Sequence, residues 1–129
     1  MSSEPRSASV VLLVDSKTRD LPVATLIAHH LRMQGITAWL EPLEAYQGVL
    51  AAHRPELIFI SAGFDAHRED DMGQLGLVEH DYAWITRQLM DVAEIHSRGR
   101  IVSCLEGGYH LSALARSVSA HLRVLADLG

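Results

Sequence analysis

Runs of apolar residues alternate with stretches of helical periodicity along the whole chain. Short apolar runs typical of buried strands occupy residues 10–14, 36–40, 57–60 and 101–105. The segments after these runs repeat apolar residues every three or four positions. This spacing predicts amphipathic helices, which cover residues 23–31, 43–53, 82–96 and 111–125. The pattern therefore predicts a strand followed by a helix, repeated to the end of the chain.

Residues with cap and turn preferences mark the ends of these elements. Asp20 can cap the first helix, Pro22 suits its first turn, and Gly35 suits the position just after its end. Pro55 stops the second helix and Gly99 ends the third. The boundaries read from single residues thus agree with the periodicity.

Alternating strands and helices predict a three-layer αβα fold with a four-stranded parallel sheet, Rossmann-like or flavodoxin-like in kind. No repeat, linker or low-complexity stretch divides the chain. We therefore expect residues 1–129 to form a single α/β domain, with the polar residues 1–9 as a flexible arm. Function in open sheets of this kind lies at the carboxyl ends of the strands.

Composition narrows the class of protein. The chain has 129 residues, 48% apolar and 21% charged, which is typical of one folded domain. Its net charge of -5 makes nucleic acid and anionic membrane surfaces unlikely partners, so we expect neither. The single cysteine excludes an intramolecular disulfide, and no apolar run is long enough to span a membrane. Without an apolar leader segment, we expect a cytoplasmic protein.

An acidic residue follows each predicted strand: Asp15, Glu41, Asp65 and Glu106. Such an edge could bind a hard or borderline cation. The alternative is that loops are acidic because the protein is acidic, which applies most to Glu41. The loop from Ser61 to Val78 is long for a compact domain, and loops of this length are often functional.

Two motifs stand out in the second half of the chain. Residues 55–67 read PELIFISAGFDAH, and residues 105–109 read LEGGY. The first resembles the segment of histone deacetylase-like amidohydrolases that supplies a zinc-binding aspartate, and the second resembles another segment of that family, which includes the acetylpolyamine amidohydrolases. The resemblance runs from about residue 54 to about residue 125. Shorter stretches are also similar: residues 73–77, 82–89 and 99–102.

The resemblance implies a site. Asp65 matches the family's second aspartate ligand to zinc, and Tyr109 matches the tyrosine whose hydroxyl polarises the acetyl carbonyl and stabilises the oxyanion. Gly107 and Gly108 match the glycines beside the acyl-lysine tunnel. Zinc would be the cofactor, and acetyl-lysine or an acetylpolyamine would be the substrate. The family places its corresponding strands side by side, which predicts the strand order 2-1-3-4.

The first half of the chain departs from the family pattern. The family's other zinc ligands form an Asp-x-His motif, and its general base is a pair of adjacent histidines in a glycine-rich loop. Nothing before Arg54 matches either one. Two further metal ligands are considered: His67, because Asp-x-His spacing lets both side chains meet one metal, and Asp15. We therefore expect a partial zinc amidohydrolase that is inactive or very weak as an isolated chain.

Residues 10–53 loosely resemble the amino-terminal α/β half of surface-polysaccharide biosynthesis proteins. On that interpretation, residues 54–129 form a deacetylase-like half joined to an unrelated one, as in a truncated or chimeric protein. The alternative function is a non-catalytic α/β module, receiver-like or binding a small ligand or metal, with Asp15 and Asp65 in an acidic pocket. No lysine ends a later strand, which counts against a receiver. The sequence leaves homo-oligomerisation open.

Overall fold

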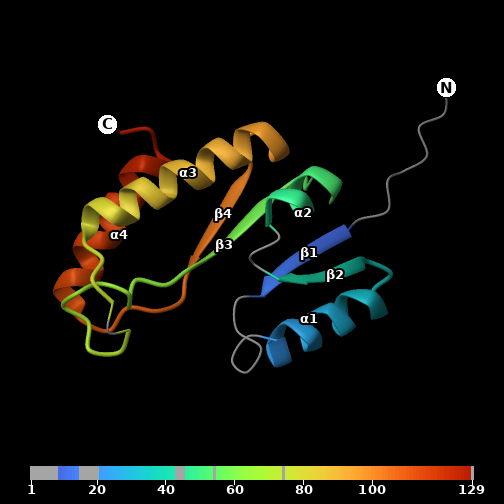
Figure 1. The fold of residues 1–129 in the computed structure, drawn as a ribbon, viewed down its shortest axis with the longest axis horizontal. Coiled ribbons are helices and arrows are strands. Elements are labelled where there is room, and N and C mark those ends of the chain that lie inside the picture. The colour runs from blue at the N-terminus through green and yellow to red at the C-terminus, as the bar shows by residue number, and fades with distance from the viewer. Residues whose placement is uncertain (1–8, 15–20, 43–45, 54, 74, 129) are drawn as a thin grey trace. The chain divides into compact units, whose positions relative to one another are not determined.

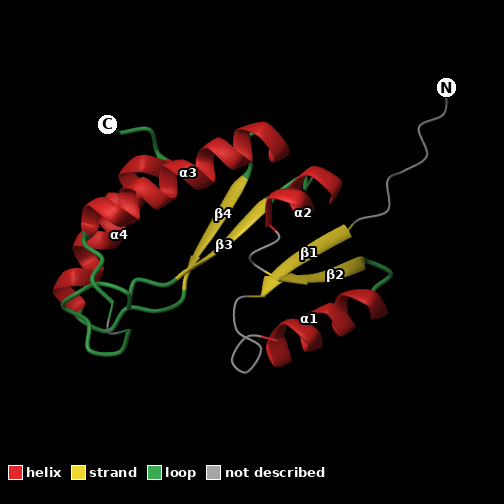
Figure 2. Cartoon of the chain, viewed as in Figure 1, coloured by secondary structure: helices red, strands yellow, loops and turns green. Residues whose placement is uncertain are grey.

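Strands and helices alternate along the chain, as the sequence predicts (Figure 1, Figure 2). The structure is a computed structural model that describes residues 9–14, 21–42, 46–53, 55–73 and 75–128. The elements in chain order are β1 (Ser9–Val14), α1 (Leu21–Met33), β2 (Thr37–Pro42), α2 (Tyr46–His53), β3 (Ile58–Ala62), α3 (Glu79–Ser97), β4 (Ile101–Leu105) and α4 (Leu111–Leu125). The chain divides into unit 1, Met1–Pro55, and unit 2, Glu56–Gly129.

The described strands form two parallel pairs. In unit 1, β1 pairs with β2 in a register that places Val11 opposite Trp39. In unit 2, β3 pairs with β4, and Ala62 lies opposite Leu105. The predicted strand order 2-1-3-4 is therefore confirmed for two parallel pairs, β2 with β1 and β3 with β4. The described strands make two two-stranded sheets where one of four strands was expected, and the β1–β3 pairing stays a prediction. The alternation of strands and helices predicts the pairing of strands that follow each other within a unit, but it does not predict the pairing of β1 with β3.

Unit 1 is built on contacts between α1 and its two strands. Ala28 on α1 and Ala38 on β2 are both 1% exposed, so small side chains allow the helix to lie close to the sheet. Arg32 adds a hydrogen bond between α1 and β2, because its Nη2 donates to the carbonyl of Ala38 at 2.6 Å. Gly35 follows the end of the helix, as predicted, with φ +76° and its N–H donated to the Arg32 carbonyl at 3.0 Å. The cap expected at Asp20 lies outside the described residues.

Unit 2 has its core where β3 and the loop after it meet both helices. Ala62, Phe64 and Tyr82 form the buried cluster, and Leu114 and Val118 of α4 pack against it. The rings of Phe64 and Tyr82 lie 5.1 Å apart between centroids, tilted by 49°. Figure 1 shows α3 and α4 packed along each other in this unit. The core therefore lies directly beside the residues that follow β3.

The strands of unit 2 are not buried on both faces, contrary to the expectation from their continuous apolar sequence. Burial alternates along β3, so that Ile60 turns toward the core while Phe59 is 63% exposed. Cys104 on β4 is exposed as well. A continuous apolar run shows that a strand is hydrophobic, but it does not show which face other elements pack against. Here α3 and α4 pack against Ile60 and Ala62.

Local caps explain the ends of the two long helices. Asp81, in the first turn of α3, accepts the N–H of Val78 through Oδ2 at 2.8 Å. At the other end Arg98 has φ 55° and Gly99 has φ 71°, which turns the chain out of the helix where the sequence predicted its end. The helix α4 begins after His110, whose Nδ1 accepts the N–H of Ala113 at 3.2 Å.

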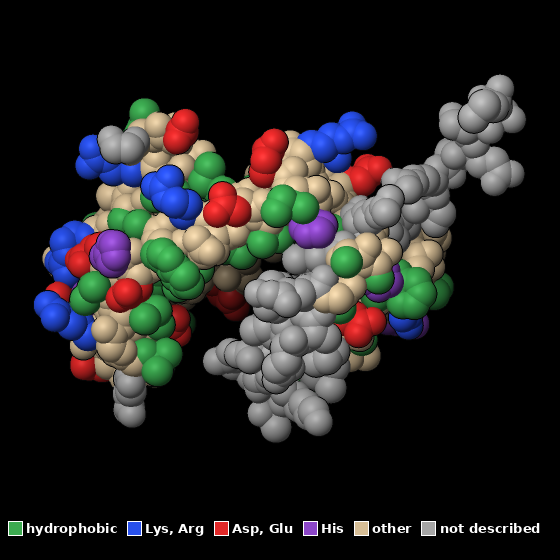
Figure 3. All heavy atoms as spheres, turned by 45° about the horizontal axis from the view of Figure 1, so that its top comes forward, with side chains coloured by type: hydrophobic (Ala, Val, Ile, Leu, Met, Phe, Trp, Pro, Cys, Tyr) green, Lys and Arg blue, Asp and Glu red, His purple; other side chains and the backbone are tan. Residues whose placement is uncertain are grey.

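The surface carries both signs of charge. On the face drawn in Figure 3, acidic and basic side chains are interspersed with apolar ones rather than gathered into one patch. Among the described helices, none combines the length and the apolarity needed to cross a bilayer.

Candidate functional site

The carboxyl ends of β3 and β4 form one continuous edge. Pairing extends past the strands, because Glu106 donates its N–H to the Ala62 carbonyl at 3.0 Å and Phe64 donates its N–H to the Gly107 carbonyl at 2.8 Å. These two bonds bring the loop after β3 and the loop after β4 side by side. The residues expected from both motifs therefore share one edge of unit 2.

Asp65 lies in this edge with glycine on two sides. A Cβ built on Gly107 would lie 3.2 Å from Oδ1 of Asp65 and 3.3 Å from its Cγ, and a Cβ on Gly63 would lie 3.2 Å from Oδ1. Both contacts are tighter than ordinary van der Waals packing. The absence of side chains at Gly63 and Gly107 thus leaves the room that the Asp65 carboxylate occupies.

Gly108 has a different role from Gly107. Its φ of +129° is rarely adopted by residues with a side chain, and a Cβ there would lie 2.7 Å from Cδ1 of Leu114 and 3.2 Å from Cβ of Phe64. Gly108 therefore packs against the core of unit 2 and lets the chain turn toward Tyr109. The Tyr109 side chain is 61% exposed. The expectation that its hydroxyl and Asp65 face one cleft stays a prediction.

Asp70 is a residue of this site that the sequence did not single out. Its side chain is only 4% exposed. Oδ2 accepts the N–H of Tyr109 at 2.6 Å and that of His110 at 2.9 Å, while Oδ1 accepts the N–H of Met72 at 3.0 Å. These bonds, the one from Tyr109 first, hold the pKa of the Asp70 carboxyl below its usual range. No sequence signal separates Asp70 from the other acids of the loop, since its partners are backbone amides.

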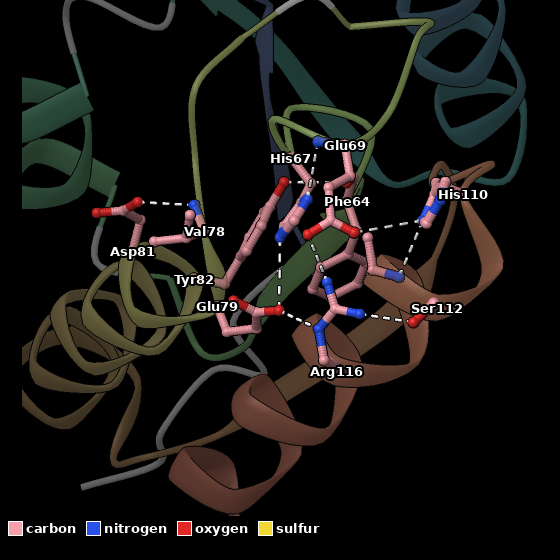
Figure 4. A network of polar contacts seen from close by, with 11 residues as sticks. Phe64, His67, Glu69, Val78, Glu79, Asp81, Tyr82, His110, Ser112 and Arg116 are labelled. Atoms are coloured by element: carbon pink, nitrogen blue, oxygen red, sulfur yellow. Dashed lines mark hydrogen bonds and ion pairs between the residues drawn. The ribbon is translucent and has the colours of Figure 1, made fainter.

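Tyr82 holds the residue just before Asp65. Its hydroxyl donates to the Phe64 carbonyl at 2.9 Å (Figure 4). Burial, aided by the nearby negative charges of Asp65, Asp70 and Asp81, raises the pKa of the phenol to about 12. Tyr82 therefore stays neutral and keeps donating over the whole range in which proteins normally work.

His67 is almost fully buried, at 1% exposure, and the prediction that it joins Asp65 as a metal ligand stays a prediction. Its Nδ1 accepts the N–H of Glu69 at 3.1 Å, and its Nε2 lies 3.5 Å from Oε1 of Glu79 (Figure 4). The backbone around it pairs with Leu77 in an isolated bridge. In this arrangement Nδ1 bonds within the loop, while Nε2 faces Glu79 at the start of α3 and has no hydrogen-bond partner among the described residues.

Arg116 of α4 joins the two acids that flank His67. It contacts Glu79 through Nε and Glu69 through Nη2, the latter at 2.9 Å, and Figure 4 shows both carboxylates converging on the guanidinium. The hydrogen bond from Arg116 is the main cause that lowers the pKa of Glu79 to about 2, and it also lowers the pKa of Glu69. The same pairs raise the pKa of Arg116. This cluster therefore fastens the loop to both helices rather than offering free ligands.

The described residues do not offer a metal ion a complete ligand set at this edge. No group of three His, Cys, Asp or Glu side chains in the described part of the chain is placed to hold a metal ion. A catalytic zinc needs about three protein ligands. Asp15, considered as a further ligand, lies outside the described residues. Asp65 thus fits zinc only as one member of a set completed elsewhere.

Comparison with known proteins assigns the class. A histone deacetylase domain profile matches residues 17–125, so the chain belongs to the histone deacetylase family. Type-2 histone deacetylase 1 of Dictyostelium discoideum is 51% identical over 75 residues, which cover 58% of this chain and 5% of that protein. A probable deacetylase of Methanothermobacter thermautotrophicus is 42% identical over 60% of this chain and 22% of its own length. The mouse polyamine deacetylase HDAC10 is 41% identical over 55% of this chain and 10% of its own length.

Solved structures agree with this assignment. The HDA15 HD domain shares 34% identity and superposes with a TM-score of 0.54, covering 61% of this chain and 21% of that one. The histone deacetylase Clr3 gives the same TM-score at 30% identity and covers 66% of this chain and 14% of that one. The chain therefore has the deacetylase type of α/β fold over that part, and it spans about a fifth or less of these relatives.

The extent of the family match corrects one interpretation of the sequence. The profile begins at residue 17, so it includes most of residues 10–53, for which the sequence suggested an unrelated, polysaccharide-protein origin. A βαβ unit has few residues that distinguish one family from another, which explains why short local likenesses in this half were misleading.

Proposed function

We propose that this chain carries one part of a zinc amidohydrolase site, in which Asp65 is a metal-ligating carboxylate and Tyr109 is the oxyanion donor. The observation that carries this proposal is the close approach of the Asp65 carboxylate to Gly107, 3.2 Å from the position of a Cβ there, at the shared end of β3 and β4. Two motifs far apart in the chain, at residues 55–67 and 105–109, thereby meet at one point.

The chemistry of amide hydrolysis explains the division of roles. An amide carbonyl becomes an oxyanion in the transition state, and a donor aimed at that oxygen stabilises the developing charge. The exposed phenol of Tyr109 is a donor of this kind, and the missing side chain at Gly107 leaves room for the Asp65 carboxylate. Zinc, when bound, would supply Lewis acidity. Asp65 supplies negative charge to hold it.

The substrate class proposed for the complete site is an acetylated amine. Relatives of this chain carry the names histone deacetylase and polyamine deacetylase, and both describe removal of an acyl group from an amine. The chain's own share of that site lacks a matched histidine base and two matched ligands. Hydrolysis of an acetylated amine therefore requires a histidine base and two further zinc ligands in addition to Asp65 and Tyr109.

Metal placement tests the proposal directly. The full chain, labelled with ¹⁵N, is titrated with Co²⁺, a paramagnetic substitute for zinc, and amide signals are followed by NMR. We expect the signals of Gly63, Asp65 and Gly107 to respond first and Asp65→Asn to remove that response. Asp71→Asn is the matched control, because Asp71 is an exposed acid of the same loop. A response that Asp71→Asn abolishes equally, or that spreads over all acidic loops, contradicts the proposal.

A further inference from the structure

One buried carboxylate joins the two loops that carry the proposed site. Asp70 lies in the loop after β3, five positions beyond Asp65, and its Oδ2 accepts the N–H groups of Tyr109 and His110 at 2.6 and 2.9 Å. Its other oxygen accepts the N–H of Met72 at 3.0 Å, within its own loop. A single side chain thus holds the backbone of both loops at once.

We infer that Asp70 is a positioning residue for Tyr109, which sets the place of the phenol relative to the Asp65 carboxylate. The inference rests on the proposed function, since it assigns Tyr109 and Asp65 to one site. It goes further by naming the group that keeps them together, a residue that contacts neither substrate nor metal.

The position of Gly108 shows why such a residue is needed. The bond from Phe64 N–H to the Gly107 carbonyl, at 2.8 Å, fixes the chain only as far as Gly107. Gly108 follows with φ +129°, a conformation open to glycine but rarely adopted by residues with a side chain, so the backbone is least restricted at this position. The Tyr109 amide is the first group after this pivot that a side chain holds, and Asp70 holds it.

The strength of this contact also distinguishes it from its neighbours. A hydrogen bond to an ionised acceptor is stronger than a neutral one, and the bonds of Asp70 are shielded from water at 4% exposure. A second side-chain link between these loops is the approach of Glu69 to His110 at 3.8 Å, and both of those side chains are well exposed. Exposed pairs of that kind contribute little.

Amide exchange in the Asp70→Ala variant of the full chain tests the inference. We expect hydrogen exchange of the Tyr109 and His110 amides to speed up at least about tenfold, because hydrogen bonds to charged groups are typically worth that factor or more. The amides of β3, β4, α3 and α4 should keep their protection, and Asp71→Ala, at an exposed neighbour, should leave Tyr109 and His110 unchanged. Unaltered exchange at Tyr109 and His110 in Asp70→Ala overturns the inference.

A titration of the wild-type chain keeps the test decisive if Asp70→Ala fails to fold. Protonation of Asp70 should move the amide proton shifts of Tyr109 and His110 together, with one midpoint below the usual value of 3.8 for an aspartate, since the pKa of Asp70 is lowered. Of the other titratable groups nearby, His110 and its partner Glu69 are removed in the variants His110→Asn and Glu69→Gln, in which the joint midpoint should persist, and Tyr82 is neutral throughout this pH range. Independent midpoints for the two amides contradict the inference.

The Tyr109 ring gives a readout that loop stability alone does not move. With Co²⁺ bound near Asp65, the ring signals of Tyr109 should shift in the wild type, and this shift should fall in Asp70→Ala while that of Gly107 remains. An unchanged ring shift in Asp70→Ala counts against positioning. Absence of any Co²⁺ effect at Gly107 in the wild type counts against the proposed function instead, and the amide exchange result then decides the role of Asp70.

Discussion

At the residue scale, buried polar side chains on the two packed helices differ in whether they have a partner. Ser97 on α3 is 1% exposed, and its hydroxyl donates to the Ala93 carbonyl at 3.0 Å. Ser117 on α4 is 0% exposed, and its hydroxyl has no hydrogen-bond partner among the described residues. A buried hydroxyl without a partner costs free energy, typically about 1–3 kcal/mol.

Ser117→Ala should therefore stabilise unit 2, by about 1 kcal/mol after a small loss of packing, because it removes an unsatisfied donor and adds a better helix former. Ser119→Ala is the matched control on the same helix: Ser119 is exposed, and its hydroxyl donates to Ala115 at 2.8 Å. Urea unfolding followed by the fluorescence of Trp84 on α3 measures both free energies of unfolding. A gain for Ser117→Ala no larger than that for Ser119→Ala contradicts the prediction.

Two glycines in the loop after β3 differ in the space around them. A Cβ on Gly73 would lie 2.1 Å from the carbonyl oxygen of Asp65, whereas a Cβ on Gly76 would meet nothing within 4 Å. Gly73→Ala should destabilise unit 2 by about 1–3 kcal/mol, because backbone must move, and shift the NMR signals around Asp65. Gly76→Ala should stay within about 0.5 kcal/mol of the wild type. Equal effects of the two substitutions in urea unfolding contradict this prediction.

At the scale of elements, a buried chain of hydrogen bonds joins α3, α4 and β4. Thr86 donates its only hydroxyl hydrogen to the Tyr82 carbonyl at 2.6 Å, so its oxygen accepts from Nδ1 of His121 at 2.7 Å. Nε2 of the neutral ring then accepts from the Ser103 hydroxyl at 2.9 Å. The chain of bonds is satisfied with His121 uncharged, and burial lowers the pKa of His121 accordingly.

This lowered pKa predicts how stability depends on pH. The unfolded chain binds a proton at His121 near the ordinary pKa of 6.5, and the folded chain does so only at lower pH. The contribution of neutral His121 is therefore fully present above pH 6.5 and is lost as the pH falls below it. Urea unfolding at pH 7.5 and pH 5.5 should show this fall, and His121→Gln should reduce it.

His80→Gln is the control for loss of one histidine, since His80 is exposed on α3. It should leave the difference between the two pH values close to that of the wild type. An identical pH difference in the wild type and His121→Gln contradicts the assigned role of the buried ring.

The elements of unit 2 and part of its site were predictable from sequence for a physical reason. Helical periodicity locates α3 and α4, and neighbouring parallel strands end at the same edge, which is why the segments that carry Asp65 and Tyr109 were expected side by side. The role of Asp70 was not predictable, because its partners are backbone amides about 40 positions away and any loop acid could fill it. The exposure of Phe59 was not predicted, because the sequence of a strand does not show which other elements pack against each of its faces.

At the scale of the whole molecule, the chain corresponds to only part of its relatives, and this limits the catalytic groups that it contains. The chain corresponds to 22% of the Methanothermobacter relative and to 21% of the HDA15 HD domain. Membership of the family assigns the type of fold, and the kind of site is the one proposed above. The described residues bring one matched carboxylate and one matched donor to it, with no three-residue metal group.

The isolated chain should therefore hydrolyse acetyl-lysine only near the background rate. A single matched carboxylate leaves the other positions on zinc to water, so zinc should bind at Asp65 only weakly and be lost on dialysis. Without a positioned base, a further factor of about 10²–10⁴ is missing. A fluorogenic acetyl-lysine assay with metal analysis of the dialysed chain measures both. The variants Asp65→Ala and Tyr109→Phe should match the wild type. One equivalent of zinc that survives dialysis, with turnover that either variant abolishes, would show instead that the chain completes its own site.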